Sequence, residues 1–134
     1  MSSIRSAVED VCSRSVDDLA GAALEEELDE LTWVERAVAA RRLALIARID
    51  RVRPYVSEGF LSTSSWVAVR YHESSSVATE NVKTARALEE MPATREALGE
   101  GEISGSSVRV LVGAHDSSPE PFDEAEPMLV DAAK

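Results

Sequence analysis

This sequence contains few cysteines and histidines, the residues that often cross-link small proteins, bind metal ions or act in catalysis. Among 134 residues there are one cysteine, Cys12, and two histidines, His72 and His115. A single cysteine cannot close an internal disulfide, and neither histidine lies at metal-ligand spacing from another histidine or a cysteine. A chain of this length buries roughly two thirds of its unfolded surface, so it needs neither a disulfide nor a metal ion to stabilise its fold. We therefore expect one domain with no disulfide, no metal site and no cofactor.

Long apolar runs are missing as well. The longest, residues 43–47, is far shorter than the roughly 20 residues needed to cross a bilayer. The first thirty residues hold nine acidic side chains and lack the apolar stretch of a secretory signal. We expect a soluble, cytoplasmic protein that does not engage a membrane.

The sequence also lacks the short signatures of catalysis. It contains no P-loop, no Gly-x-Gly-x-x-Gly and no Gly-x-Ser-x-Gly. The segment Gly99-Glu100-Gly101 predicts a turn, because no Lys-Ser or Lys-Thr pair follows it to hold a phosphate. No nucleophile with its base and no metal set can be assembled from the residues present. We expect that this chain is not an enzyme.

The charge is strongly negative, −11 at pH 7, and unevenly spread. Residues 1–35 carry ten acidic residues and two arginines, whereas residues 36–53 carry six arginines and a single aspartate. One interpretation is a helix whose acidic beginning and basic end complement its dipole. The other is a patch that faces an anion. The acidic total argues against a protein that coats nucleic acid non-specifically.

Helical periodicity dominates the first half of the chain. Ser15 followed by Asp18 is typical of a helix start, and Pro54 ends the pattern. A break near Thr32 would give two nearly collinear helices. A continuous helix would exceed roughly 50 Å, which predicts packing against a partner helix or a bend. Apolar residues recur at steps of three, four or seven: Leu24, Leu28, Leu31, Val38, Leu45, Ile49 and Val52.

Shorter helices are predicted after Gly59, and no segment alternates as a strand would. The final acidic segment is expected to be partly helical at best, because Pro127 interrupts it. The fold class is therefore all-α: a long N-terminal helix or helix pair followed by a cluster of short helices. We assign residues 1–134 to one helical domain, with residues 1–53 as a long arm and residues 60–134 as a compact cluster. The expected short helices are 62–72, 76–91, 92–99, 104–114 and part of 120–133.

Two pairs of these helices have the layout of a helix-turn-helix, in which the second helix enters the major groove of DNA. In the first pair the polar turn 73–75 precedes the helix 76–91. Its groove-facing residues would be Ser76, Thr79 and Lys83, with Arg86 reaching a phosphate. Its weakness is electrostatic, since acidic residues outnumber basic ones on this helix and phosphate contacts need positive charge.

The second pair joins Pro92-x-x-Arg95-x-x-Leu98 to Ile103-Ser104-x-x-x-Val108-Arg109-x-Leu111 through the Gly99–Gly101 turn. It is similar to the helix-turn-helix of the plasmid-partition DNA-binding proteins, over about twenty residues. The DNA contacts would then be Arg95, Ser106 and Arg109. The alternative interpretation is two ordinary packed helices joined by a glycine turn.

Four blocks follow one another in an order that resembles a known family. They are Ile46-Ala47-Arg48-Ile49-Asp50-Arg51, Gly59-Phe60-x-Ser62-x-x-x-Trp66-x-Ala68, Ala78…Val82-x-x-Ala85-Arg86-Ala87-Leu88-x-x-Met91-Pro92 and Ala97-Leu98-x-x-Gly101-x-Ile103-Ser104. Over residues 15–134 the chain resembles the 13E12-repeat family, also called domain of unknown function 222, which is common in actinobacteria.

The resemblance implies an all-helical module that precedes an HNH nuclease domain and binds DNA or a partner. The HNH part would cleave DNA with a metal ion. Through Lys134 the chain holds no HNH histidines and no paired cysteines, so we expect no nuclease activity from these residues. Members of the family often carry several arginines on the helix 76–91, where this chain has Thr79, Asn81 and Thr84.

Two hypotheses for function follow. The first is a non-catalytic accessory module that binds double-stranded DNA through the helix-turn-helix elements. The second is a protein-interaction or oligomerisation module, in which the helix within residues 16–53 pairs with a copy of itself or with another chain.

Overall fold

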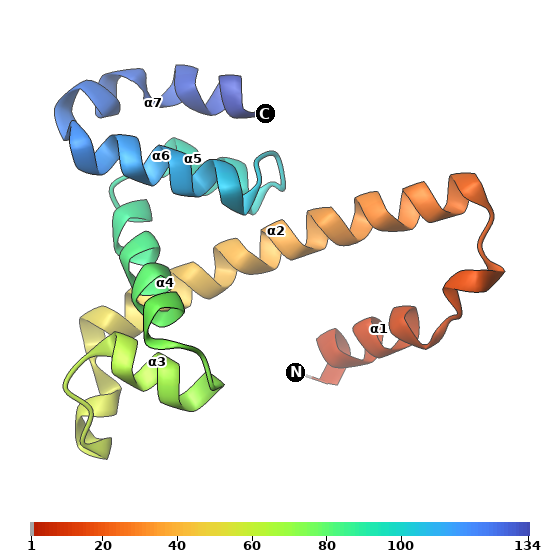
Figure 1. The fold of residues 1–134 in the computed structure, drawn as a ribbon, viewed down its shortest axis with the longest axis horizontal. Helices are drawn as coiled ribbons and strands as arrows, with labels where there is room; N and C mark the ends of the chain where they lie inside the picture. Colours follow the sequence, from red (N-terminus) through yellow and green to blue (C-terminus); the bar gives the residue numbers. More distant parts are fainter. Residues whose placement is uncertain (1) are drawn as a thin grey trace. The chain divides into compact units, whose positions relative to one another are not determined.

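The computed structural model describes residues 2–134, and these contain seven α-helices and no strand (Figure 1). The predicted all-α class is confirmed. The elements are α1 (Ser2–Ser13), the 3-10 helix η1 (Val16–Asp18), α2 (Gly21–Val52), the 3-10 helix η2 (Pro54–Glu58), α3 (Thr63–Tyr71), α4 (Ser75–Leu88), α5 (Pro92–Gly99), α6 (Gly105–Ser117) and α7 (Pro119–Ala133). Among these helices none is long and apolar enough to span a bilayer.

Contacts along the chain divide it into two compact units. The first unit ends at Thr32 and holds α1, η1 and the beginning of α2, and the second unit is Trp33–Lys134. Residues 33–52 of α2 thus belong to the same unit as residues 60–134, whereas the predicted arm comprised all of residues 1–53.

The first unit differs from its predicted form at the start of the long helix. Ser15 does cap a helix, but that helix is the single turn η1, in which the Ser15 side chain accepts from the amide of Asp17. Leu19 is extended, with φ −94° and ψ 136°, so α2 begins only at Gly21. Short polar side chains that bond to nearby amides favour such isolated turns. No break occurs at Thr32, whose hydroxyl donates to the carbonyl of Leu28 within the helix, at 2.8 Å.

Serine caps define the starts of three helices in the second unit. Ser62, Ser74 and Ser104 precede α3, α4 and α6, and all three have extended backbones. Each side chain accepts from the amide three residues on, at 3.1–3.2 Å. These bonds satisfy amides that have no partner inside the helix. The predicted starts of these helices are confirmed.

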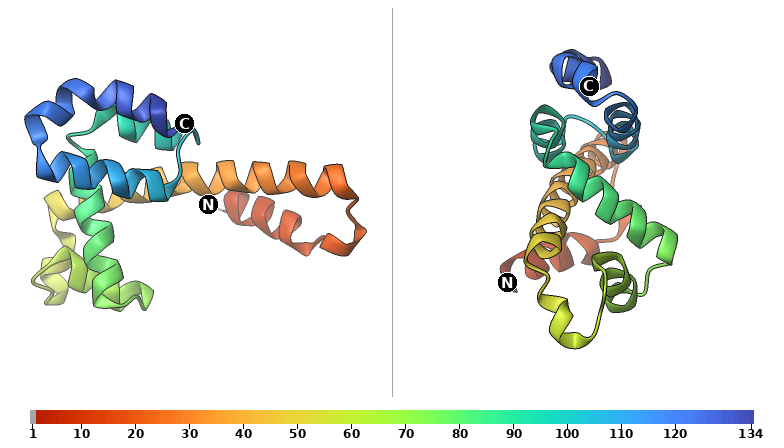
Figure 2. Two further views of the ribbon diagram at one scale, coloured as in Figure 1. Left: turned by 45° about the horizontal axis from the view of Figure 1, so that its top comes forward. Right: turned by 90° about the vertical axis from the view of Figure 1, so that its left-hand side faces the viewer.

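Two apolar clusters form the core of the second unit. One joins the end of α2 to η2, α3 and α4, and it includes Ile46, Tyr55, Trp66 and Val82. The other joins the end of α4 to α5, α6 and α7, and it includes Met91, Leu98, Ile103 and Phe122. Figure 2 shows α7 returning alongside α6. The helices of the second unit are therefore held by a core that runs through α4.

The prediction that Pro127 breaks the last helix is wrong. α7 continues through Pro127 to Ala133. Its buried residues Phe122, Glu126 and Val130 pack along one face, whereas Pro127 is exposed. Proline removes the bond to the carbonyl of Asp123, four residues back. Asp123 is exposed too, so water can satisfy that carbonyl while the apolar face keeps the helix in place.

Candidate nucleic-acid interface

The predicted contacts on α4 lie at the surface. Ser76, Thr79 and Lys83 are spaced by three and four residues and are all exposed, so they share one face of the helix. Lys83 already has a carboxylate partner, since its Nζ lies 3.3 Å from Asp116 Oδ2. This face of α4 therefore offers hydroxyl groups and one neutralised lysine.

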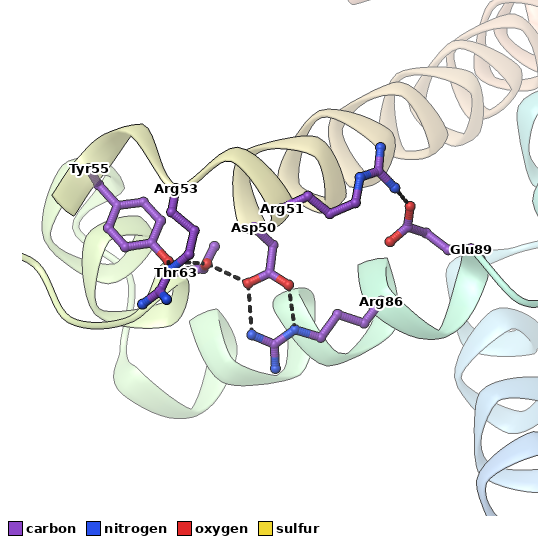
Figure 3. Close-up of polar contacts among 7 residues, drawn as sticks. All are labelled: Asp50, Arg51, Arg53, Tyr55, Thr63, Arg86 and Glu89. Carbon is purple, nitrogen blue, oxygen red and sulfur yellow. Dashed lines mark hydrogen bonds and ion pairs between the residues drawn. The ribbon is translucent and has the colours of Figure 1, made fainter.

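Arg86, the predicted phosphate contact, is held by α2 instead (Figure 3). Its Nε and Nη2 each donate to one oxygen of Asp50, at 2.7 Å. Such a bidentate pair fixes the guanidinium plane and is stronger than a neutral hydrogen bond. Arg51, one residue further along α2, pairs with Glu89 at the end of α4. Both contacts join α2 to α4, and Arg86 has little freedom to reach a phosphate.

Asp50 is the centre of a longer hydrogen-bond chain. The Thr63 hydroxyl donates to Asp50 Oδ1 at 2.6 Å. The Tyr55 hydroxyl lies 2.8 Å from Thr63 Oγ1, and Arg53 Nε donates to that Tyr55 oxygen at 3.3 Å. Because an ionised carboxylate only accepts, Thr63 must donate to Asp50 and accept from Tyr55. These hydrogen bonds link η2 and α3 to α2. They help to position α3 and α4, the first predicted pair of helices.

We expect this network to make stability depend on pH. The hydrogen bonds from Arg86, helped by Thr63 and opposed by burial, lower the pKa of Asp50 from 3.8 to about 2. A lowered folded-state pKa stabilises the protein above pH 4, and that contribution is lost as the pH falls from about 4 to about 2. Because 59% of the Arg86 side chain is exposed, solvent screens the pair. We therefore expect it to contribute about 1–2 kcal/mol to the free energy of unfolding, less than the full pKa shift would correspond to.

Urea unfolding at pH 6 and at pH 2 checks this expectation. Asp50→Asn should destabilise the protein by about 1–2 kcal/mol at pH 6. At pH 2 the loss should be much smaller, because the pH is then close to the folded-state pKa of Asp50 and well below its ordinary value of 3.8. A difference between Asp50→Asn and the wild-type protein that does not change with pH would contradict the assignment.

The turn between α5 and α6 is braced by α2. Trp33 Nε1 donates to the carbonyl of Glu100, and Arg36 Nη1 donates to the carbonyl of Gly101, both at 3.0 Å. Gly101 has φ +73°, a conformation that glycine adopts without cost. α5 and α6 are thus held at a fixed geometry, with Ile103 buried between them.

On α6 the predicted contacts Ser106 and Arg109 are both exposed. Arg109 lines a groove of about 520 Å³ together with Arg42 of α2. Apolar residues such as Leu43 and Val108 also line this groove, and Glu73 and Glu80 lie along it. Its two arginines are therefore balanced by two glutamates.

Arg95 does not share this groove. It lines a smaller groove of about 160 Å³, together with Arg51 and Glu89. The structure thus places Arg109 and Arg42 along the same groove and Arg95 in another. The sequence did not predict Arg42 as a site residue. The arginine-rich stretch 36–53 was the available signal for Arg42.

Acidic residues lie on the turn that precedes α6. The hydrogen bond between the side chains of Glu100 and Glu102, together with the charges of Glu102 and Glu96, raises the pKa of Glu100. By contrast, residues 105–115 of α6 contain no acidic residue. The acidic residues of the turn therefore end before α6 begins.

The two histidines lie at helix ends. His72 follows α3 with φ 55°, and His115 lies buried in the last turn of α6, where its ring meets Phe122 edge-on at 5.5 Å. Within residues 2–134, no three His, Cys, Asp or Glu side chains are grouped so that they could hold a metal ion.

The second unit is an all-helical module, in which one apolar cluster joins the end of α2 to α3 and α4, and the other joins the end of α4 to α5, α6 and α7. A family model described as Domain of unknown function (DUF222) matches residues 25–132, and the chain belongs to this family. The resemblance to domain of unknown function 222 is thereby confirmed, while the HNH context that it implies stays a prediction. No curated protein and no solved structure matches the chain.

Proposed function

We propose that this chain is a non-catalytic module that binds double-stranded DNA through α6 and assists a separate HNH-type nuclease in the cytoplasm. One observation carries the proposal. In a chain with 25 acidic residues, residues 105–115 contain none, and they present Ser106 and Arg109 to solvent. This is the second helix of the second predicted pair, the position from which a recognition helix enters the major groove.

Three features of α6 suit a DNA backbone. The amides at the start of a helix attract phosphate oxygens, because the helix dipole places partial positive charge there. The Ser106 hydroxyl can donate to a phosphate, and Arg109 supplies a full positive charge without a carboxylate partner among residues 2–134. With Arg42 as the other nearby cation, we expect about two phosphate contacts and therefore weak, strongly salt-dependent binding.

We expect a fluorescein-labelled 20-base-pair duplex to bind at about 20 mM salt, and its affinity to fall about tenfold between 50 and 200 mM. Arg109→Ala should weaken binding by about three- to tenfold and reduce the salt slope by about one, because one phosphate contact is lost. Fluorescence anisotropy titrations at several salt concentrations measure both quantities.

Arg95→Ala is the matched control, since it removes the same charge from a different groove. It should change the affinity by less than twofold. Absence of binding at 20 mM salt, or equal losses in both variants, would contradict a DNA surface on α6.

A second candidate is the interaction module within residues 16–53. The observation that favours it is that α2 carries large apolar side chains that are exposed to solvent, among them Leu28 and Leu45. Monomeric proteins seldom expose long apolar stretches without a partner.

A further inference from the structure

The groove that Arg42 and Arg109 line holds opposite charges that do not pair with one another. All of its lining residues belong to the second unit, and its volume of about 520 Å³ is typical of sites for small molecules. Arg42 lies on α2 and Arg109 on α6, whereas Glu73 precedes α4 and Glu80 lies on it. Within residues 2–134, no ion pair involves any of these four side chains. Such a groove suits a ligand that carries both negative charge and hydrogen-bond donors.

An aromatic ring lies beside one of the arginines. Tyr71, the last residue of α3, lines the groove and is 48% exposed. The Arg42 guanidinium lies over its ring, with Cζ 5.6 Å from the ring centroid, and Trp66 meets the same ring edge-on at 6.1 Å. The ring is therefore held in place from two sides. Aromatic rings and guanidinium planes are the surfaces on which an unpaired nucleobase stacks.

The side of the groove formed by α4 and the turn before it offers mainly hydrogen-bond acceptors. Asn81 Nδ2 donates to Glu73 Oε2 at 3.3 Å, which uses one of its two N–H groups and leaves the other for a ligand. The Glu80 carboxylate is exposed and has no side-chain partner within the described part of the chain. This side of the groove therefore presents two acceptor oxygens on Glu80 and one donor on Asn81.

We propose that this groove binds an unpaired guanine nucleotide. The Watson–Crick edge of guanine carries two neighbouring donors, N1–H and N2–H, which match the two oxygens of the Glu80 carboxylate. It also carries one acceptor, O6, which matches the remaining N–H of Asn81. Arg42 and Arg109 supply positive charge for the phosphate, and the base stacks beside Tyr71. In a duplex this edge of guanine is engaged by cytosine, so the nucleotide must be unpaired.

Other occupants satisfy fewer of these groups. Adenine and cytosine each present one amine beside a ring acceptor, and thymine presents a single ring N–H between two carbonyls. Each of them would place an acceptor against one oxygen of Glu80. An apolar side chain from a partner protein would fill the groove but would bury charges without giving them partners, which costs free energy.

Isothermal titration calorimetry of the full chain with dGMP and with dTMP tests the proposal. We expect dGMP to bind at least about tenfold more tightly, because a bidentate contact discriminates against a wrong base by about that factor. Glu80→Gln should remove this preference by weakening the binding of dGMP and not of dTMP, since an amide accepts with one atom only. Glu124→Gln is the matched control, because it makes the same charge change on α7, outside the groove, and should leave both affinities unchanged.

Two further variants separate stacking from charge. Tyr71→Ala should weaken the binding of dGMP about tenfold, whereas Tyr71→Phe keeps the ring and should not weaken it. Arg109→Ala should weaken the binding of dGMP and dTMP to the same extent, because both ligands carry the same phosphate. Circular dichroism checks that each variant remains folded, and the preference of the wild-type protein for dGMP tests the proposal without any variant.

Pentanucleotides distinguish a free nucleotide from one within a DNA strand. A preference for d(TTGTT) over d(TTTTT) would identify the ligand as an unpaired guanine in a strand, and a preference confined to dGMP would identify a free nucleotide. Absence of dGMP binding, equal affinities for dGMP and dTMP, or an unchanged preference in Glu80→Gln would overturn the proposal.

This inference goes beyond the binding of duplex DNA by α6, although the two sites share Arg109. Titration with dGMP involves no duplex, so nucleotide binding can hold where duplex binding fails. Glu80→Gln removes an acceptor for the base and no positive charge, so it should not weaken the binding of a duplex. The failure of either proposal is therefore seen separately from that of the other.

Discussion

Replacing Glu126 with alanine is expected to lower the free energy of unfolding by about 3 kcal/mol. Glu126 is 4% exposed and lies in α7. Its Oε2 accepts two hydrogen bonds from Thr94 in α5, from the amide at 2.7 Å and from the hydroxyl at 2.8 Å. Alanine would leave both donors of the fully buried Thr94 without a partner.

The size of this effect follows from how α5 begins. Its N-cap residue, Met91, has no side-chain acceptor, and Pro92 occupies the first turn. The first amides of a helix need an acceptor from outside the helix, and Glu126 supplies it from α7. Its negative charge also lies at the positive end of the α5 dipole. One carboxylate thus caps α5 and fastens α7 to it.

Urea unfolding followed by circular dichroism measures the loss. Glu126→Gln keeps an oxygen that can accept both bonds but removes the charge, so it should cost about 1 kcal/mol. Thr94→Val removes the hydroxyl bond to Glu126 and leaves the amide bond. Its destabilising effect should be much smaller in the Glu126→Ala background, because there the hydroxyl no longer has this acceptor to lose. A loss below about 0.5 kcal/mol in Glu126→Ala would show that the contact does not fasten α7.

The local features of the fold could be predicted because their causes lie within a few residues. A serine before a helical repeat accepts from an amide three residues on, which places the starts of α3, α4 and α6. A glycine after a helix predicts the turn at Gly101. These interactions need no knowledge of the rest of the chain.

Contacts between distant residues could not be predicted in this way. Nothing near Glu126 shows that Thr94, thirty-two residues earlier, needs an acceptor. Asp50 meets Arg86 across thirty-six residues. The error at Pro127 has the same origin, because packing of the opposite face of α7 outweighs a local signal for a break.

The candidate site shows both cases. Exposure of Ser106 and Arg109 could be predicted from the helical period of α6, since the buried residues Val108, Leu111 and Val112 occupy the other face. The engagement of Lys83 and Arg86 by Asp116 and Asp50 could not, because each partner lies on another helix.

Gly101→Ala is expected to destabilise the protein by about 3 kcal/mol, for two reasons that act together. Alanine at φ +73° costs about 1–2 kcal/mol. The added Cβ would also lie 2.3 Å from Trp33 Cδ1 and 2.8 Å from Trp33 Nε1. The ring must therefore move and lose its hydrogen bond to Glu100, which costs about 1 kcal/mol more.

The two contributions can be separated with Trp33→Ala. In that background the ring is absent, so Gly101→Ala should cost only the backbone part, about 1–2 kcal/mol. Gly105→Ala is the matched control, because a Cβ there meets no atom within 4 Å and alanine favours the helix. Equal costs of Gly101→Ala with and without Trp33, measured by urea unfolding, would contradict the role of the ring. A smaller cost without Trp33 would establish that α2 fixes the α5–α6 turn, on which the orientation of Arg109 depends.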